Sequence, residues 1–423
     1  MTAGLALGLD VGTSGVRGIV VDLDGAVVGD AAVPLPAPER RSDGAVLQDP
    51  RIWAEALDRV IVALPRRREI RVLAIDGTSG TLLVTDSRGR PLAPARLYND
   101  ASAAGRAAAI GEVAPPESGA HGATSPLARL LDLQAEQPDA VHALHQADWL
   151  AAGLTGRFGV SDDNNALKLG WNPIGRCWPD WMDGLAVRRE LLPEVLAPGD
   201  TLGKIDARRA AELDLDPETL VVAGTTDGCA SFLATGAAEY GEGVTALGST
   251  LTLKLLSDRP IFAPQFGVYS HRMGDRWLVG GASNSGGAAL LRFFTAEAMA
   301  ELEPRLEPER PTGRVWHPLP GKGERFPLAD PDLVFEPDDR PDDEAAFFQA
   351  LLEGVAGVEA SAYAKLQELG ASPLRSVRTV GGGAANAAWS RIRARRLGVP
   401  LEPALSTEAA HGTAHLALEQ LVS

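Results

Sequence analysis

The stretch LALGLDVGTSGVRGIVVDLDG, Leu5 to Gly25, has two apolar runs on either side of a bend that contains Gly12 and Gly15. Apolar runs joined by a glycine-rich bend are typical of a β-hairpin. A second stretch, GVTALGSTLTLKLLSD from Gly243 to Asp258, has the same design around Gly-Ser-Thr. The chain therefore predicts a fold in two related halves.

Further apolar runs end in glycine-rich turns and continue into helical patterns, as in LVVAGTTDGCASFLATGA, WLVGGASNSGGAALLRFF and SVRTVGGGAANAAWSRIRARRLGV. The stretch VLAIDGTSGTLLVTDSRGRPL predicts strand, glycine bend and strand. Helical periodicity is expected over 127–150, with an interruption near Pro138, and over 344–369, and surface loops are expected over 303–343. Strands alternating with helices, with glycine turns at the switches, predict an α/β fold.

Length and composition bound the class of protein. At 423 residues the chain is too long for one hydrophobic core, so we expect two domains of about 200 residues each. Its formal charge of −16, without a Lys/Arg-rich block, argues against nucleic-acid binding. No stretch resembles a membrane span or a signal peptide, and Cys177 and Cys229 have no metal or redox spacing. We expect a cytoplasmic protein that binds neither nucleic acid nor membranes.

The glycine turns together indicate phosphate binding, because backbone N–H groups at such turns bind anions without positive side chains. A P-loop is excluded, since the sequence has no GxxxxGK[ST]. GLDVGTSG is not GxGxxG and leads into a strand-like run, where a dinucleotide-binding fingerprint leads into a helix. One such turn alone is more often an ordinary connection, so the prediction depends on several turns occurring together.

Asp10 and Asp227 each follow an apolar strand at a glycine bend. Such a pair suits magnesium-dependent phosphoryl transfer, in which one carboxylate organises the metal and the other accepts a proton from the acceptor hydroxyl. An Asp near Gly also commonly forms an Asx-turn or a helix N-cap. For Asp227 taken alone, both interpretations stay open.

Other polar groups are given structural roles. His411 and His415 are one helical turn apart without a third metal ligand, so we expect surface or cleft-lining groups. His142 and His145 are expected to be solvated. Cys229 has no neighbouring His or Lys that would activate it, so we expect it to pack within a helix.

Four stretches, GLDVGTSGVRGIVVD, GTTDGCASFLATGA, TALGST and VGGGAANAAW, resemble the two phosphate motifs and the adenosine motif of the FGGY carbohydrate kinases, members of the actin-like ATPase superfamily. The resemblance covers nearly the whole chain in order. Within it, AIDGTSGTLL, LYND, NALKLGW, GGASNSGG, LPGKGERFPLADP and EAAHGTAHLA are most similar to the short D-ribulose kinases of cyanobacteria and plants. The resemblance implies two actin-like (ribonuclease H-like) α/β domains with a ligand cleft between them.

The resemblance also implies domain bounds and roles. Residues 1–234 plus 408–423 would form the sugar-binding and catalytic domain, and 235–407 the nucleotide-binding domain. Asp227 takes the position of the catalytic base. Asp10, Ser79 and Asp227 fall at the sugar, and Asp10 also falls at the metal. The residues implied at the nucleotide are Asp10, Gly12, Thr13, Gly248, Ser249, Thr250, Gly381, Gly382, Gly383 and Asn386. Trp389 is expected either in the core or beside the adenine.

The implied activity is ATP-dependent phosphorylation of the terminal hydroxyl of a ketopentose, D-ribulose to D-ribulose 5-phosphate, with Mg²⁺ as cofactor. The chain departs from better-known members on the sugar side. It has LYNDAS where xylulokinases and glycerol kinases have Trp-x-Asp-x-Arg, and GTSG where many xylulokinases have Met-His. A kinase for D-xylulose, L-ribulose or a polyol is the alternative. A non-catalytic sugar or nucleotide sensor is a second alternative. The presence of both Asp10 and Asp227 argues against it.

Overall fold

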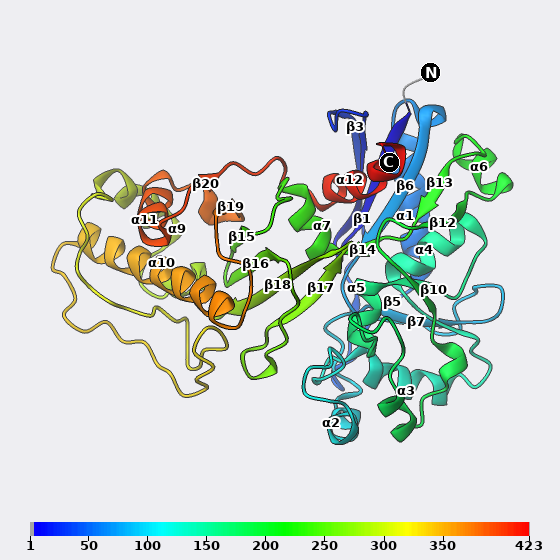
Figure 1. Cartoon of the computed structure of the whole chain (residues 1–423), viewed down its shortest axis with the longest axis horizontal. Helices are drawn as coiled ribbons and strands as arrows, with labels where there is room; N and C mark the ends of the chain where they lie inside the picture. Colours follow the sequence, from blue (N-terminus) through cyan, green and yellow to red (C-terminus); the bar gives the residue numbers. More distant parts are fainter. Residues whose placement is uncertain (1–3, 423) are drawn as a thin grey trace. The chain divides into compact units, whose positions relative to one another are not determined.

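The computed structural model describes residues 4–422, which form two compact α/β units (Figure 1). The first unit contains the chain up to Ala234, together with His271–Gly274 and the residues from Glu408 onward. The second contains Thr235–Ser270 and Asp275–Thr407. Strands and helices alternate in both, which confirms the α/β class.

The main sheet of the first unit is built around the predicted hairpin. β1 (Leu5–Val11) pairs antiparallel with β2 (Gly15–Val21), and β2 pairs with β3 (Val27–Pro34). On its other side β1 pairs in parallel with β6 (Ile70–Gly77). The order is β12-β13-β6-β1-β2-β3, where β13 is Leu220–Val222 and β12 is Thr201–Lys204, and the short β14 (Thr225–Thr226) pairs with the end of β6.

The sheet of the second unit repeats this order of strands. β15 (Glu242–Leu247) and β16 (Leu251–Ser257) form the second predicted hairpin, and β16 pairs antiparallel with β18 (Arg276–Ser283). β19 (Ser376–Val380) runs parallel to β15, and β20 (Leu401–Glu402) runs parallel to β19. Each sheet thus has three antiparallel strands followed by a strand parallel to the first, so the prediction of two related halves is confirmed.

Glycines allow unusually close packing against the central strands of the first unit. Helix α12 (Ala409–Val422) lies along β1 and beside α7 (Asp227–Ala234) (Figure 1). A Cβ at Gly8 of β1 would lie 2.1 Å from the Ala410 carbonyl oxygen, and one at Gly412 would lie 2.0 Å from that of Ala230. A side chain at Gly8 would push α12 away from β1, and one at Gly412 would push it away from α7.

The remaining elements complete the two units. The other helices are α1 (Pro50–Ala63), α2 (Ala107–Val113), α3 (Pro126–Glu136), α4 (Gln146–Thr155), α5 (Asp163–Ala166), α6 (Ala207–Leu213), α8 (Gly287–Leu290), α9 (Ala296–Leu302), α10 (Glu344–Glu368) and α11 (Ala387–Leu397). The other strands are β4 (Glu39–Arg40), β5 (Val46–Gln48), β7 (Leu82–Thr85), β8 (Ala95–Arg96), β9 (His142–His145), β10 (Val160–Asp162), β11 (Glu194–Leu196) and β17 (Tyr269–Met273). Short 3₁₀ turns include η3 (Leu167–Leu169) and η8 (Gly382–Ala385).

Four structural expectations were wrong in whole or in part. The segment 127–150 holds the strand β9 between α3 and α4, and His145 is fully buried and hydrogen-bonded to Asp148, so it is not solvated. The segment 303–343 is mostly irregular, as expected, but it buries Trp316 and Phe326 in the core that α10 covers. His411 is 5% exposed and its ring lies 4.6 Å from that of the half-buried His415, so they are not surface groups.

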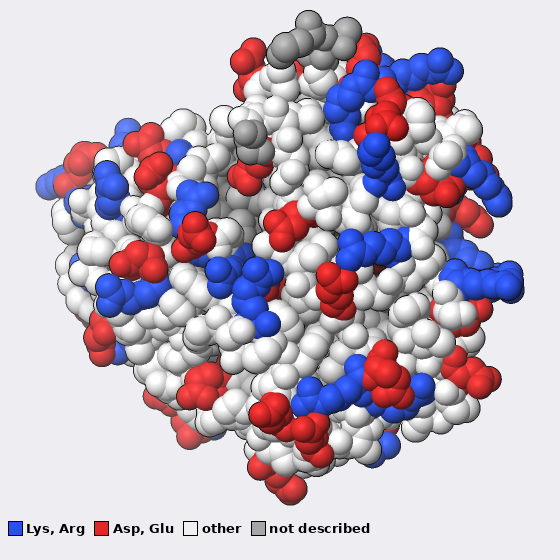
Figure 2. Space-filling view, turned by 45° about the vertical axis from the view of Figure 1, so that its right-hand side comes forward, with Lys and Arg blue, Asp and Glu red and all other residues white. Residues whose placement is uncertain are grey.

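The surface carries both positively and negatively charged side chains. On the face drawn in Figure 2, Lys and Arg side chains are interspersed with Asp and Glu side chains. Within residues 4–422, no helix combines the length and apolar character needed to cross a membrane.

Candidate active site

Two carboxyl groups meet where β1 and β6 end. Asp10 of β1 and Asp76 of β6 are direct partners in the parallel register, and the Asp76 carboxyl donates a hydrogen bond to Asp10. Asp76 is fully buried and Asp10 is 7% exposed. Two carboxylates this close repel each other, so one shared proton, held by Asp76, is the stable arrangement.

Burial and neighbouring charges set the protonation of this pair. Burial raises the pKa of Asp10, and the hydrogen bond from Asp76 and the Arg17 guanidinium act in the opposite direction. Burial, followed by the charge of Asp10, raises the pKa of Asp76 well above its usual range. Asp10 therefore carries the negative charge of the pair. The Arg17 guanidinium, on the paired strand β2, lies 3.4 Å from Asp10 Oδ2.

Helix α12 supplies the second partner of Asp76. Thr413 Oγ1 donates a hydrogen bond to Asp76 Oδ2, and Thr413 is fully buried. Asp76 Oδ1 accepts a hydrogen bond from no donor within residues 4–422, which suits a carboxyl that uses a proton to reach Asp10. The close contact of α12 with β1, made possible by Gly8, brings the Thr413 hydroxyl to this position.

Asp227 is the first residue of α7 and lies just beyond β14. Thr226 pairs with Gly77, so Asp227 emerges at the same sheet edge as Asp10 and Asp76, and its charge raises the pKa of both. Gly224 permits this path, since a Cβ there would lie 1.8 Å from the Ile75 carbonyl oxygen. The Asp227 side chain accepts a 2.7 Å hydrogen bond from Gly228 N and is half-buried.

The bend that follows β6 holds the predicted sugar residue. Ser79 lies between Thr78 and Gly80, and its Oγ is buried without a hydrogen-bond partner in residues 4–422. Thr78 is fixed by Gln146 and Thr81, whose side-chain oxygens lie 3.0 and 2.6 Å from Thr78 Oγ1. A buried hydroxyl without a partner costs free energy, which a ligand hydroxyl would recover.

A buried arginine holds this bend. Arg129 on α3 is fully buried, and its guanidinium donates to the carbonyl oxygens of Gly80, at 2.7 Å, and of Leu97. Burial lowers the pKa of Arg129 to about 10, so it stays charged. Leu97 is the first residue of the LYND segment, in which Asn99 Oδ1 is buried without a partner in the described chain. Arg129 thus ties together two segments whose unpartnered polar atoms suit a polyhydroxylated ligand.

In the second unit the predicted glycine turns gather at one sheet edge. Ala246 of β15 pairs with Val380 of β19, so the hairpin turn Gly248–Thr250 and the turn Gly381–Gly383 leave the sheet side by side. Gly287 N, at the start of α8, donates to the Gly248 carbonyl at 2.9 Å. A Cβ at Gly381, where φ is +87°, would lie 2.7 Å from the Leu247 carbonyl oxygen, so the close approach requires glycine.

The predicted nucleotide residues have local roles as well. Gly12 N closes the first hairpin by donating to the Gly15 carbonyl at 3.0 Å, and Thr13 lies half-buried in this turn. Gly248, Ser249 and Thr250 are exposed. The Asn386 side chain caps α11 by accepting from Trp389 N at 2.6 Å, and Trp389 is buried in the core. Cys229 is buried in α7, as expected.

Sequence reasoning missed Asp76, Thr413 and Arg129. The stretch AIDGTSGT contains Asp76, and an acidic residue at the end of a strand flanked by glycine was a usable signal. Thr413 gave none, because its role depends on α12 lying against β1.

The site fits a magnesium ion. Mg²⁺ in phosphoryl-transfer sites is held by one or two carboxylates plus substrate phosphates, and Asp10 offers a negatively charged carboxylate that is 7% exposed. Within residues 4–422 no group of three or more His, Cys, Asp or Glu forms a metal cage.

Comparison of the sequence with known proteins finds related carbohydrate kinases. Residues 5–234 match the model of the FGGY family of carbohydrate kinases, N-terminal domain, and residues 236–420 match its C-terminal domain. A xylulose kinase from Escherichia coli is 26% identical over 94% of this chain and 85% of that protein. One from Streptomyces coelicolor is 30% identical, over 60% of this chain and 55% of that protein.

Solved structures show the same fold. A crystal structure described as a xyloylose kinase from Brucella ovis has a TM-score of 0.84 and 25% identity, covering 98% of this chain and 90% of that one. Plasmodium falciparum glycerol kinase with ADP has a TM-score of 0.82 at 15% identity, covering 99% of this chain and 90% of that one, a likeness of fold alone.

Proposed function

Because the chain belongs to the FGGY family of carbohydrate kinases, we propose that it transfers the γ-phosphoryl group of ATP to the terminal hydroxyl of a ketopentose, D-ribulose. One observation carries the proposal. Asp10, Asp76 and Asp227 come from separate segments to a single sheet edge, and one of the three is kept protonated.

The roles of the carboxylates follow from their surroundings. Asp227 is half-buried at the start of α7, where it can accept a hydrogen bond from the C5 hydroxyl and then its proton. In a loose phosphoryl-transfer transition state the base mainly positions the attacking oxygen, so an ordinary carboxylate suffices. The proton moves from the C5 oxygen to an Asp227 carboxylate oxygen as the C5 oxygen bonds to phosphorus and the β–γ bridging oxygen leaves with ADP.

Asp10 is proposed to hold Mg²⁺, which when bound neutralises charge on the phosphates. Asp76 keeps Asp10 oriented through their shared hydrogen bond, and Thr413 orients Asp76. The backbone of the turns Gly12–Thr13, Gly248–Thr250 and Gly381–Gly383 is proposed to bind the nucleotide. Glycine turns of this kind present N–H groups to phosphates without positive side chains, which suits an acidic protein.

Sugar identity depends on the segments that Arg129 holds. The unpartnered Ser79 Oγ and Asn99 Oδ1 offer one group that can donate or accept a hydrogen bond and one that accepts. Lys168 lies near the same bend, since a Cβ at Gly80 would be 3.9 Å from Lys168 Cδ. The GTSG and LYNDAS segments, which resemble those of D-ribulose kinases, support D-ribulose. The names of the Escherichia coli and Streptomyces relatives favour the second candidate, D-xylulose, which differs from D-ribulose in configuration at C3.

A sugar panel tests the proposal. ADP release is measured with D-ribulose, D-xylulose, L-ribulose and glycerol, and D-ribulose is expected to give the highest kcat/KM. A highest value with D-xylulose would overturn the substrate but keep the kinase. Thermal stabilisation by sugar without ADP release from any member would indicate a sensor and overturn the catalytic proposal.

A further inference from the structure

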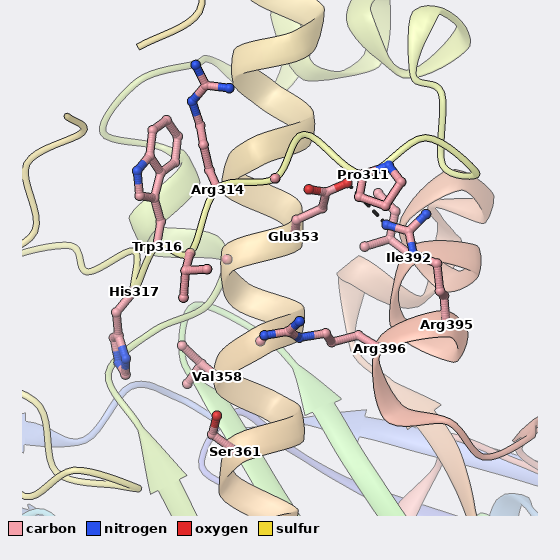
Figure 3. A pocket seen from close by; sticks show the side chains of 14 residues that line it. Pro311, Arg314, Trp316, His317, Glu353, Val358, Ser361, Ile392, Arg395 and Arg396 are labelled. Carbon is pink, nitrogen blue, oxygen red and sulfur yellow. Dashed lines mark hydrogen bonds and ion pairs between the residues drawn. The ribbon is translucent and has the colours of Figure 1, made fainter. Parts of the chain in front are cut away.

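The second unit contains a pocket on α10 that the proposed reaction does not use (Figure 3). Its volume is about 480 Å³, within the usual range of about 300–1,000 Å³ for small-molecule sites. Its walls are the segment Pro311–His317, the α10 residues Glu353 to Ser361, and the α11 residues Ile392 to Arg396. All of these residues belong to one compact unit.

The wall formed by the irregular segment is held firmly against α10. Glu353 Oε2 accepts hydrogen bonds from Thr312 N and Oγ1 at 3.0 and 2.6 Å, and Gln349 binds the backbone of Glu307 and Arg310. A Cβ at Gly354 would lie 2.8 Å from Pro318, so this glycine lets the segment pack directly on the helix. The pocket is therefore a built feature of the fold.

One of the three arginines that line the pocket has no hydrogen-bond or ion-pair partner in the described part of the chain. Arg314 pairs with Asp339, and Arg395 donates to Glu353 Oε1 and to the Pro308 carbonyl. Arg396 is exposed and has no hydrogen-bond or ion-pair partner in the described part of the chain, and Figure 3 shows it reaching from α11 toward α10. An unpaired guanidinium over a pocket is a ready partner for an anion with several acceptor oxygens.

Gly357 opens the floor beneath Arg396. A Cβ at this position would lie 3.6 Å from Arg396 NH2, an ordinary contact, so packing does not require glycine here. Glycine within a helix costs about 0.5–1 kcal/mol relative to alanine. With no side chain at 357, the space between Arg396 and the exposed Ser361 hydroxyl stays free.

The lining combines positive charge with apolar surface. Asp339 and Glu353 balance Arg314 and Arg395, so the charge of Arg396 is left over and makes the pocket locally positive in a protein whose formal charge is −16. Val315, Val358 and Ile392 add apolar surface beside the guanidinium groups. We propose that the pocket binds a small organic molecule that carries a phosphate group next to an apolar part.

This pocket is separate from the glycine turns. Arg396 lies ten residues after Asn386, the N-cap of α11, and a rise of 1.5 Å per residue puts them about 15 Å apart along the helix axis. A ligand here would contact the opposite end of α11 from Gly381–Gly383. The inference is therefore independent of the proposed kinase reaction.

Phenyl phosphate is a suitable probe, since it joins a phosphate to a small apolar ring. Its binding is measured by titration calorimetry on the full chain in excess non-hydrolysable ATP analogue, which occupies any nucleotide site. We expect saturable binding at one site, and binding of benzyl alcohol and benzoate at least about tenfold weaker. Absence of saturable binding would overturn the proposal, and equal binding of benzoate would overturn the phosphate class.

Two variants locate the site. Arg396→Gln is expected to weaken phenyl phosphate binding at least about tenfold, the order of one charge-assisted hydrogen bond. Arg391→Gln on the same helix is the matched control, because Arg391 is exposed, equally charged and outside the pocket, and should bind like wild type. Gly357→Leu should block binding by filling the floor. Wild-type affinity in Arg396→Gln or Gly357→Leu, or equal weakening in Arg391→Gln, would contradict the assignment.

Discussion

Asp10 and Asp76 lie directly opposite each other on adjacent parallel strands, joined by a hydrogen bond between their carboxyl groups. The pair behaves as one unit with one proton and one negative charge. Removing either member changes the orientation and charge of the other, so the two residues should be tested together with their neighbour Thr413.

Thr413→Val removes the hydroxyl that donates to Asp76 while keeping the shape of the side chain. We expect kcat to fall about tenfold, the equivalent of one buried hydrogen bond. Thr413→Ser keeps the hydroxyl and should retain most of the activity, with both variants measured by steady-state kinetics. Equal rates in the Val and Ser variants would show that the hydroxyl does not act through Asp76.

Asp10→Ala should lose most activity, because the only carboxylate proposed to hold Mg²⁺ is gone. Extra magnesium should restore the rate only in part, and half-saturation should move to higher magnesium concentration. Asp30→Ala, at an exposed position on β3, controls for loss of one negative charge. A magnesium titration that is unchanged in Asp10→Ala would remove Asp10 from the metal site.

Ser79→Ala removes the buried hydroxyl at the bend after β6. We expect KM for the ketopentose to rise about tenfold while KM for ATP stays constant, since one ligand hydrogen bond is lost. Ser87→Ala, in the exposed turn after β7, is the matched control. If KM for both substrates changes equally, Ser79 acts through the fold and not through the sugar.

Much of the fold could be predicted from local patterns. Both hairpins, the helix over 344–368 and the glycine turns follow from apolar periodicity and from positions that only glycine can occupy. The strand β9 could not be separated from its flanking helices, because four residues give too little periodicity.

The site itself could be predicted only in part. Asp10 and Asp227 stand out because glycines surround them. The Asp76–Thr413 hydrogen bond joins residues 337 positions apart, and it depends on the β1–β6 register and on α12 reaching β1. Arg129 could not be predicted, since nothing nearby in sequence reveals that its partners are distant carbonyl groups.

The raised pKa of Asp162 predicts that the stability of the folded chain depends measurably on pH. Burial, followed by the charge of Asp148, raises the pKa of Asp162 to about 8, although it accepts hydrogen bonds as the N-cap of α5. Between about pH 4 and about pH 8 the folded chain holds a proton here that the unfolded chain has released. Stability therefore falls as pH rises through this window, by at most about 1.4 kcal/mol per pH unit from this group.

The test compares urea unfolding of wild type and Asp162→Asn at pH 5 and pH 7. The Asn variant should lose less stability on going to pH 7, since it cannot release the proton. Asp180→Asn, at an exposed position, should follow wild type. Parallel losses in wild type and Asp162→Asn would mean that Asp162 titrates normally.

The most direct measurement is the rate of ketopentose-dependent ADP release by Asp227→Ala, with sugar binding followed separately by thermal shift. If Asp227 accepts the proton of the attacking hydroxyl, kcat should fall by about 10²–10⁴-fold while the sugar still stabilises the folded protein. Phosphorylation at a rate near that of wild type would contradict the assignment of Asp227 as the base.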